Sequence, residues 1–262
     1  MNDTRPADWR NYEDFSLGVA TNRLPATDTL VDKTMRIVFA SGDVAQFVFT
    51  AKHDVAWSLR DAAGADWYEA IEVAPDVLFV DMTFARAPKE ALTLIINLRS
   101  GRVLSVRCRV RDTAPAGEPR VAQDFDTGLI GDGSAVPTAM EPAPTRDLIG
   151  LRAFYDYSPN HVYEHIYMSS ERYAWQCLKG VQRGHGDVDL ATTYKFDDDL
   201  YLFTFREFRI PVASVFFYNM KTLRSTGKFL GITGAGRIEN QPAGAFIDKR
   251  SMTTYPDGLA PV

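Results

Sequence analysis

The sequence has 262 residues, of which 45% are hydrophobic, and this balance is typical of a globular protein that can bury its own core without disulfides or structural metals. The net charge is −5 at pH 7 and both signs are mixed along the chain, which disfavours binding to nucleic acid or to an anionic membrane surface. No apolar run of about eighteen residues occurs and the start is polar, so we expect a cytoplasmic protein with no spanning helix, in which Cys108 and Cys177 stay free thiols.

The first half of the chain has the pattern of a β-rich domain. The region of Trp9 and Tyr12 is expected to dock as a short helix, and strand-like runs begin near Leu30. Residues 44–49 and 55–59 are β-branched and aromatic, and turn residues at 41–43 precede the first of them. Such runs recur about every 8–15 residues with no long helix between them, which predicts an antiparallel meander that closes into a small barrel.

A connector and a second β-rich segment follow. Residues 112–146 are rich in proline and glycine, and this composition favours an exposed, extended path. Strand-like runs return at 162–167 and 173–178. The tail after Gly231 is again rich in glycine and proline, and we expect it to wrap the surface.

The two halves repeat each other. Five blocks of the first half match five of the second in the same order, which indicates an internal duplication. The matches are Leu30-Val31 with Leu148-Ile149, Ala56-Trp57 with Ala174-Trp175, residues 75–80 with 197–202, 93–98 with 215–220, and 101–104 with 227–230. We therefore predict an all-β protein of two tandem barrels, with a first domain at 1–111, a linker at 112–146 and a second domain at 147–262.

The two copies differ on one predicted inner face. Side chains alternate across a strand, so aligned positions should share a face. The first copy has Ala45, Phe47 and Phe49 there, whereas the second has Tyr163, His165 and Tyr167. A buried polar group without a partner costs about 1–3 kcal/mol, so these groups require partners, water or a ligand. The competing interpretation is a structural histidine between core tyrosines whose hydroxyl groups reach solvent.

A later strand suggests a second difference. In the alignment above, Phe84 corresponds to Arg206, so a guanidinium would point into the second barrel. Such a group needs a facing carboxylate or anion, and Glu164 or Glu207 could supply it. The opposite face of the strand is also apolar, which leaves open that Arg206 and Glu207 form an exposed pair.

Other motifs are weak. His185, Asp187 and Asp189 alternate and could bind a metal, but the flanking glycines favour a loop, and we expect no metal site and no cofactor. We find no phosphate-binding loop, nucleophile elbow or dinucleotide fingerprint. Trp57 and Trp175 occur in both copies and are interpreted as structural, although Trp175 is also near the predicted site.

The second half resembles the MoaF family. The resemblance lies in residues 163–167, 173–177, 186–189, 200–203 and 206–207, and extends over about 148–246. The first half is similar to the family's N-terminal domain more loosely. The resemblance implies two lipocalin-like, calycin-type barrels and, through the family name, a link to molybdenum cofactor biosynthesis; it implies no particular reaction.

Three functions remain open. The first is binding of a small aromatic or planar ligand in the second barrel, by Tyr163, His165, Tyr167, Trp175 and Arg206 with Tyr157, Cys177, Tyr201 and Glu207 nearby. The second is a cofactor-independent lyase, decarboxylase or isomerase, compared in fold and residue type with phenolic acid decarboxylases. In that case Arg206 and Tyr163 would orient the substrate and Glu164 or His165 would move a proton. The third is a scaffold that forms a homodimer through a barrel face.

Overall fold

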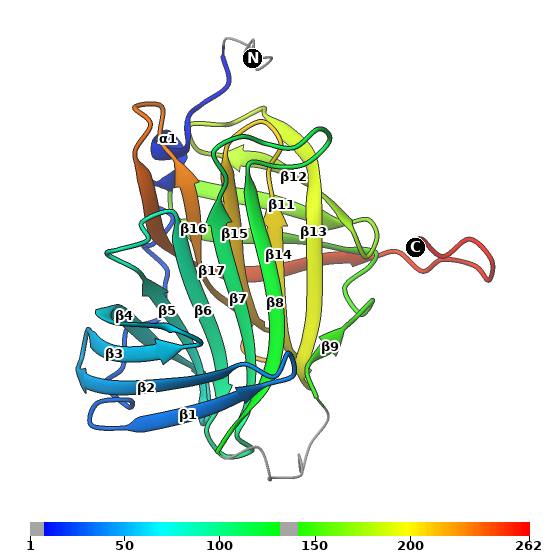
Figure 1. The fold of residues 1–262 in the computed structure, drawn as a ribbon. Helices are drawn as coiled ribbons and strands as arrows, with labels where there is room; N and C mark the ends of the chain where they lie inside the picture. Colours follow the sequence, from blue (N-terminus) through cyan, green and yellow to red (C-terminus); the bar gives the residue numbers. More distant parts are fainter. Residues whose placement is uncertain (1–7, 132–140) are drawn as a thin grey trace. The chain divides into compact units, whose positions relative to one another are not determined.

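The computed structural model describes residues 8–131 and 141–262 (Figure 1). They divide into two compact units, one of Leu24–Arg109 with Gln123–Ala143 and the other of Met1–Arg23, Val110–Ala122 and Pro144–Val262. Among the described residues, no helix is both long and apolar enough to cross a membrane. Cys108 and Cys177 are buried and form no disulfide.

The first unit contains a closed antiparallel barrel, called the first barrel below. Each strand pairs with the next, and the last strand pairs with the first. Its strands are β1 (Thr34–Phe39), β2 (Val44–Ala51), β3 (Asp54–Leu59), β4 (Ala62–Ala74), β5 (Val77–Thr83), β6 (Glu90–Asn97), β7 (Arg102–Val110) and β8 (Val121–Ile130). The segment predicted to be a linker contains strand β8. Its prolines and glycines lie on either side of this strand, and β8 pairs with β1 so that the barrel has no open edge there. Residues 132–140 of the predicted linker lie outside the described residues.

The second unit contains the second barrel, which has the same strand order. Its strands are β10 (Leu151–Ser158), β11 (His161–Tyr167), β12 (Arg172–Lys179), β13 (Gly186–Asp197), β14 (Leu200–Arg206), β15 (Val212–Asn219), β16 (Arg224–Ile232) and β17 (Ile238–Met252), with the two-residue β9 (Ala143–Pro144) beside β13. Pairing of β10 with β17 and of β12 with β13 closes the sheet. The expected surface tail is wrong over Ile238–Met252, because β17 is a barrel strand, whereas the residues after Met252 form no strand and are mostly exposed. The all-β tandem-barrel prediction is confirmed.

The turns show how the two barrels correspond. Asp76 and Asp199 both have positive φ, 62° and 59°, immediately before β5 and β14. Gly101 and Leu223, at 71° and 55°, likewise precede β7 and β16. The predicted alignment of 75–80 with 197–202 is therefore displaced by one residue, and that of Gly101 with Gly227 by four. A one-residue slip exchanges the two faces of a strand, so Phe84 corresponds to Glu207 and not to Arg206.

Residues 8–23, called the strap below, pack within the second unit. The strap contains the short helix α1 (Tyr12–Ser16), which confirms the predicted helix and buries Tyr12 and Phe15. The Tyr12 hydroxyl donates to the Phe229 carbonyl at 3.0 Å, and the Gly244 N–H donates to the Val19 carbonyl at 3.0 Å. A Cβ at position 244 would clash with the backbone of Arg23, so glycine is what lets the strap lie against β17.

Candidate ligand site in the second barrel

The inner face of β11 carries the polar side chains that the sequence predicts there. Tyr163, His165 and Tyr167 are all buried among the aromatic residues of the core, as are Ala45 and Phe47 at the aligned positions of β2. Register supports this, because Tyr163, His165 and Tyr167 lie opposite Cys177, Trp175 and Tyr173 of β12, which also point inward. The second barrel therefore has hydroxyl and imidazole groups where the first has hydrocarbon.

One part of this interior satisfies its own hydrogen bonds. The hydroxyl groups of Tyr155 and Tyr167 are 2.6 Å apart, and Tyr167 donates to Tyr218 at 3.0 Å. Burial raises the pKa of each phenol, so all three stay neutral. This cluster is a structural core, and Tyr167 does not contact the void described next.

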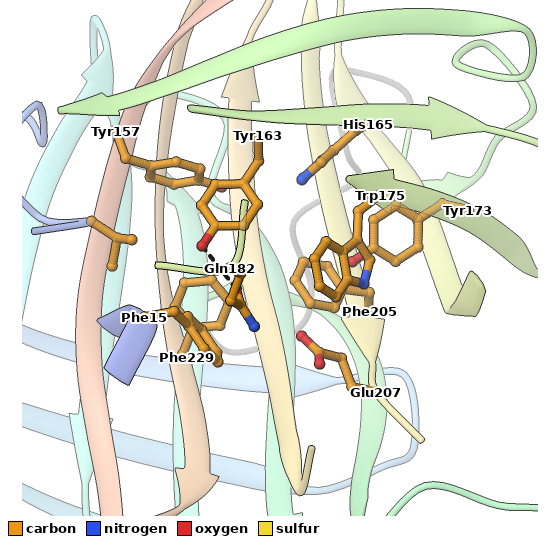
Figure 2. Close-up of a pocket in the computed structure, with 11 residues that line it drawn as sticks. Phe15, Tyr157, Tyr163, His165, Tyr173, Trp175, Gln182, Phe205, Glu207 and Phe229 are labelled. Carbon is orange, nitrogen blue, oxygen red and sulfur yellow. Dashed lines mark hydrogen bonds between the residues drawn. The ribbon is translucent and has the colours of Figure 1, made fainter. Parts of the chain in front are cut away.

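A small void of about 30 Å³ lies between the rings and the strap (Figure 2). Phe15 and Val19 of the strap line one side, and the barrel contributes Tyr163, His165, Trp175 and Glu207. Phe15 makes an edge contact with Phe229, with ring centroids 5.7 Å apart. The space holds about one or two water molecules, so a larger guest requires the strap or a lining ring to move.

Several polar groups around this void lack partners. His165 Nδ1 and the Tyr173 hydroxyl are buried and receive no hydrogen bond from the described part of the chain. His165 is 3% and Tyr173 1% exposed. The carboxyl group of Glu207, in a residue 5% exposed, also has no hydrogen bond or ion pair to any described residue. Buried polar groups are nearly always hydrogen-bonded, so three such groups around one void indicate a site for water or a ligand.

A hydrogen-bonded clamp fixes the position of Glu207. The Trp175 indole N–H donates to Asp189 Oδ2 at 2.9 Å, and the Phe208 N–H donates to Asp189 Oδ1 at 3.1 Å. The first barrel has the same clamp, in which Trp57 donates to Asp66 at 2.7 Å and Ala85 N–H donates at 2.8 Å. The clamp therefore belongs to the barrel framework, and both tryptophans take part in it.

Burial disfavours the charged forms of the titratable groups at and beside the void. Burial raises the pKa of Glu207 well above its ordinary value, and the negative charges of Asp189 and Asp187 raise it further. Burial lowers the pKa of His165 to about 3 and raises that of Asp189 to about 7. Glu207 can therefore donate a hydrogen bond, and the neutral imidazole offers one donor and one acceptor.

These pKa values predict opposing effects of pH on stability. His165 has a lowered pKa in the folded state, so the unfolded chain binds its proton first and stability falls as the pH drops from about 6.5 towards 3. Asp189 has a raised pKa, so stability falls as the pH rises from about 4 to 7. The variant His165→Phe places phenylalanine where the first barrel has Phe47, and it removes the loss of stability at low pH that His165 causes. We expect the free energy of urea unfolding to increase less, or to decrease more, between pH 4 and 6.5 in this variant than in the original chain. An unchanged pH profile would contradict the buried neutral imidazole.

Two predicted catalytic residues do not reach the void. Arg206 lies on the opposite face of β14, where its guanidinium donates to Thr192 Oγ1 at 3.1 Å and to the Ala191 carbonyl at 3.3 Å. Its predicted inward position is wrong, because the alignment was displaced by one residue. Glu164 lies on the face of β11 that points away from the barrel interior, and its carboxylate is bound by Arg152 and Gln176. These bonds keep the pKa of Glu164 low, even though burial acts to raise it.

The other predicted residues divide between the void and its surroundings. Tyr157 lines it, whereas Tyr201 donates to Asp147 at 3.0 Å and Cys177 is a buried thiol whose pKa is raised by burial. Sequence reasoning missed Tyr173, Gln182, Phe205, Phe229, Phe15 and Val19. Gln182 lies in a loop, and its side-chain oxygen accepts a hydrogen bond from the Tyr163 hydroxyl at 2.8 Å. A loop has no hydrophobic periodicity from which this position could be predicted.

The residues considered for metal binding have other partners. His185 lies 3.2 Å from Asp8 of the strap, and Asp187 pairs with Arg209 at 2.7 Å. Asp189 belongs to the clamp. His185 lies in the loop before β13, and Asp187 and Asp189 lie in this strand. Each of the three side chains therefore contacts a different neighbour.

Comparison with known proteins places both barrels in one family. The model of the MoaF C-terminal domain matches residues 142–253, and that of the MoaF N-terminal domain matches residues 7–112. This chain belongs to the MoaF family. Protein MoaF of Klebsiella aerogenes is 31% identical to this MoaF-family chain over 248 residues, which are 91% of each chain.

A solved structure, a putative beta-lactamase from Burkholderia vietnamiensis, is 12% identical and covers 39% of this MoaF-family chain and 95% of its own length. Its TM-score of 0.34 is too low to support a conclusion about fold or function.

Proposed function

We propose that the second barrel binds a small, planar, uncharged molecule between the strap and the clamp. The observation that carries this proposal is that two buried groups without partners in the described chain, His165 Nδ1 and the Tyr173 hydroxyl, belong to residues that line one aromatic void together with Glu207. A ligand that hydrogen-bonds them would recover part of the cost of burying them.

The chemistry of the lining defines the ligand class. Among the described residues, no lysine or arginine lines the void, so none of them offers a positive charge there to a carboxylate or phosphate. Neutral Glu207 can donate and neutral His165 can accept, while Tyr163, Trp175 and Phe205 present flat faces and edges. Nothing in this lining points to molybdenum cofactor assembly, so the proposed ligand is defined by the cavity alone.

The strap would control entry. The void is much smaller than the 300–1,000 Å³ or so of ordinary ligand sites, so Phe15 and Val19 must give way when a ring enters. The contacts that hold the strap, among them Tyr12 with Phe229 and Glu13 with Gly234, are not part of the barrel's strand pairing, so the strap can move without breaking that pairing.

Three single-ring probes that differ in charge test the proposal. Benzyl alcohol is uncharged, benzoate is an anion and benzylammonium is a cation. In thermal-shift titrations of the full chain, we expect the melting temperature to rise with the concentration of benzyl alcohol, because a ligand that binds the folded state stabilises it. We expect a smaller rise with each of the two ions.

The variant Glu207→Met assigns the effect to this void. We expect it to abolish the shift caused by benzyl alcohol, because the buried donor is lost. A stronger shift with either ion than with the alcohol, or an undiminished alcohol shift in the variant, would overturn the proposal.

A further inference from the structure

The first barrel has a cavity of its own, which is larger than the void in the second barrel. It measures about 920 Å³, within the range of sites that take a drug-sized ligand. Its apolar lining includes Trp57, Leu59, Phe84 and Leu92, and the Trp57 and Phe84 rings meet edge to face at 5.0 Å. All its lining residues belong to the first unit.

Two charged side chains face this cavity from inner positions of β6 and β7. Arg107 Nε donates to Glu90 Oε2 at 2.9 Å, and the Arg107 side chain remains 40% exposed while that of Glu90 is 18% exposed. At the corresponding positions of the second barrel stand Val212 and Phe229, both buried in the core. The barrel framework therefore does not need this ion pair, and its presence calls for another explanation.

The arginine has donors left for a ligand. Both recorded hydrogen bonds from Arg107 end on one carboxylate oxygen of Glu90, through Nε and Nη2. A guanidinium has five N–H donors in a planar fork, which suits a carboxylate.

The other charged lining residues, Arg60 and Arg86 with Asp61 and Asp66, balance in number, so Arg107 is the group whose remaining donors face the cavity. Asp66 accepts from Trp57 and from Ala85, so it is engaged in the clamp. Arg60 pairs with Asp43, and Arg86 and Asp61 are exposed. Phe84 takes the place that Glu207 has in the second barrel, so no carboxyl group opposes an anion there.

We propose that this cavity is a second binding site, for a molecule with a flat apolar body and a carboxylate group. The body would lie against Trp57, Phe84 and Leu92, and the carboxylate would accept from Arg107 beside Glu90. The two barrels of one chain would then select ligands of different charge.

Isothermal titration of the full chain with 2-naphthoate and with the uncharged 2-naphthalenemethanol tests this site. We expect 2-naphthoate to bind about tenfold more tightly than 2-naphthalenemethanol, which is the gain expected from one bidentate, charge-assisted hydrogen-bond pair with Arg107. Arg107→Gln should remove that preference. The double variant Glu90→Gln/Arg107→Gln should do the same without leaving an unpaired carboxylate.

Two controls make the result specific. Arg109→Gln changes a neighbouring arginine of β7 that pairs with Asp124 and does not line the cavity, so it should retain the preference. Glu207→Met alters only the second barrel and should leave 2-naphthoate binding unchanged. Equal affinity for both probes, no binding of 2-naphthoate, an equal loss in Arg109→Gln, or loss of 2-naphthoate binding in Glu207→Met would overturn this assignment.

Discussion

Replacing Glu207 by methionine is expected to make the protein more stable and unable to bind its ligand. The Glu207 carboxyl group is buried without a hydrogen-bond partner among the described residues, and methionine fills a similar volume without a polar group. Removing an unsatisfied buried group should raise the free energy of unfolding by about 1–3 kcal/mol. Urea unfolding followed by circular dichroism measures the gain, and the first barrel already has an apolar residue, Phe84, at this position.

A matched glutamate shows whether the gain is specific. Glu164 is also buried, but Arg152 and Gln176 bind its carboxylate, so Glu164→Met should destabilise the protein. If Glu207→Met lost stability as Glu164→Met does, Glu207 would have a structural partner, and its role as an open ligand contact would be contradicted.

Removing the Phe15 ring is expected to cost stability and to open the void. Phe15 is 4% exposed and packs on Tyr12 and Phe229. Phe15→Ala should lower the free energy of unfolding by about 3–5 kcal/mol, because the core loses the ring and keeps a cavity. The enlarged apolar cavity should bind benzyl alcohol more tightly than the original chain does, since an empty apolar cavity of this kind accepts small aromatic guests.

Leu17 provides the control within the same strap. It follows helix α1 and is 73% exposed, so Leu17→Ala should change stability by less than about 0.5 kcal/mol and leave affinity unchanged. Calorimetry with benzyl alcohol on both variants separates the two positions. Weaker binding in Phe15→Ala would mean that the ring forms part of the site rather than its cover.

The duplicated framework explains how one fold can hold two different sites. Both barrels keep the tryptophan–aspartate clamp, which ties β3 to β4 and β12 to β13. Around it, the first barrel places an ion pair on β6 and β7, whereas the second places Glu207 just after β14 and His165 on β11. Polar groups therefore occur inside both barrels, because Arg107 and Glu90 face the first cavity.

The sequence predicts the barrels and the inner face of β11 because alternation and internal repetition are local signals. Tyr163 and His165 are found in this way, since their strand aligns with β2 without a gap. Arg206 is misplaced because both faces of β14 are apolar, so hydropathy does not fix the register. The turn residues Asp76 and Asp199 would have fixed it, since their left-handed conformation marks equivalent positions.

The strap is beyond the reach of these signals. Phe15 and Val19 are distant in sequence from the strands that they cover, and no periodicity links them to β16 or β17. Gln182 and β8 are missed for a related reason, because a loop side chain and a strand between proline-rich turns depend on tertiary contacts rather than on local pattern.

A crystal structure of the full chain with benzyl alcohol tests the central claim most directly. We expect the ring to lie between Trp175 and the strap, with its hydroxyl within hydrogen-bond distance of His165 Nδ1 or the Glu207 carboxyl group, and with Phe15 displaced. A barrel interior that holds no ring at saturating benzyl alcohol, with Phe15 still packed on Phe229, would contradict it.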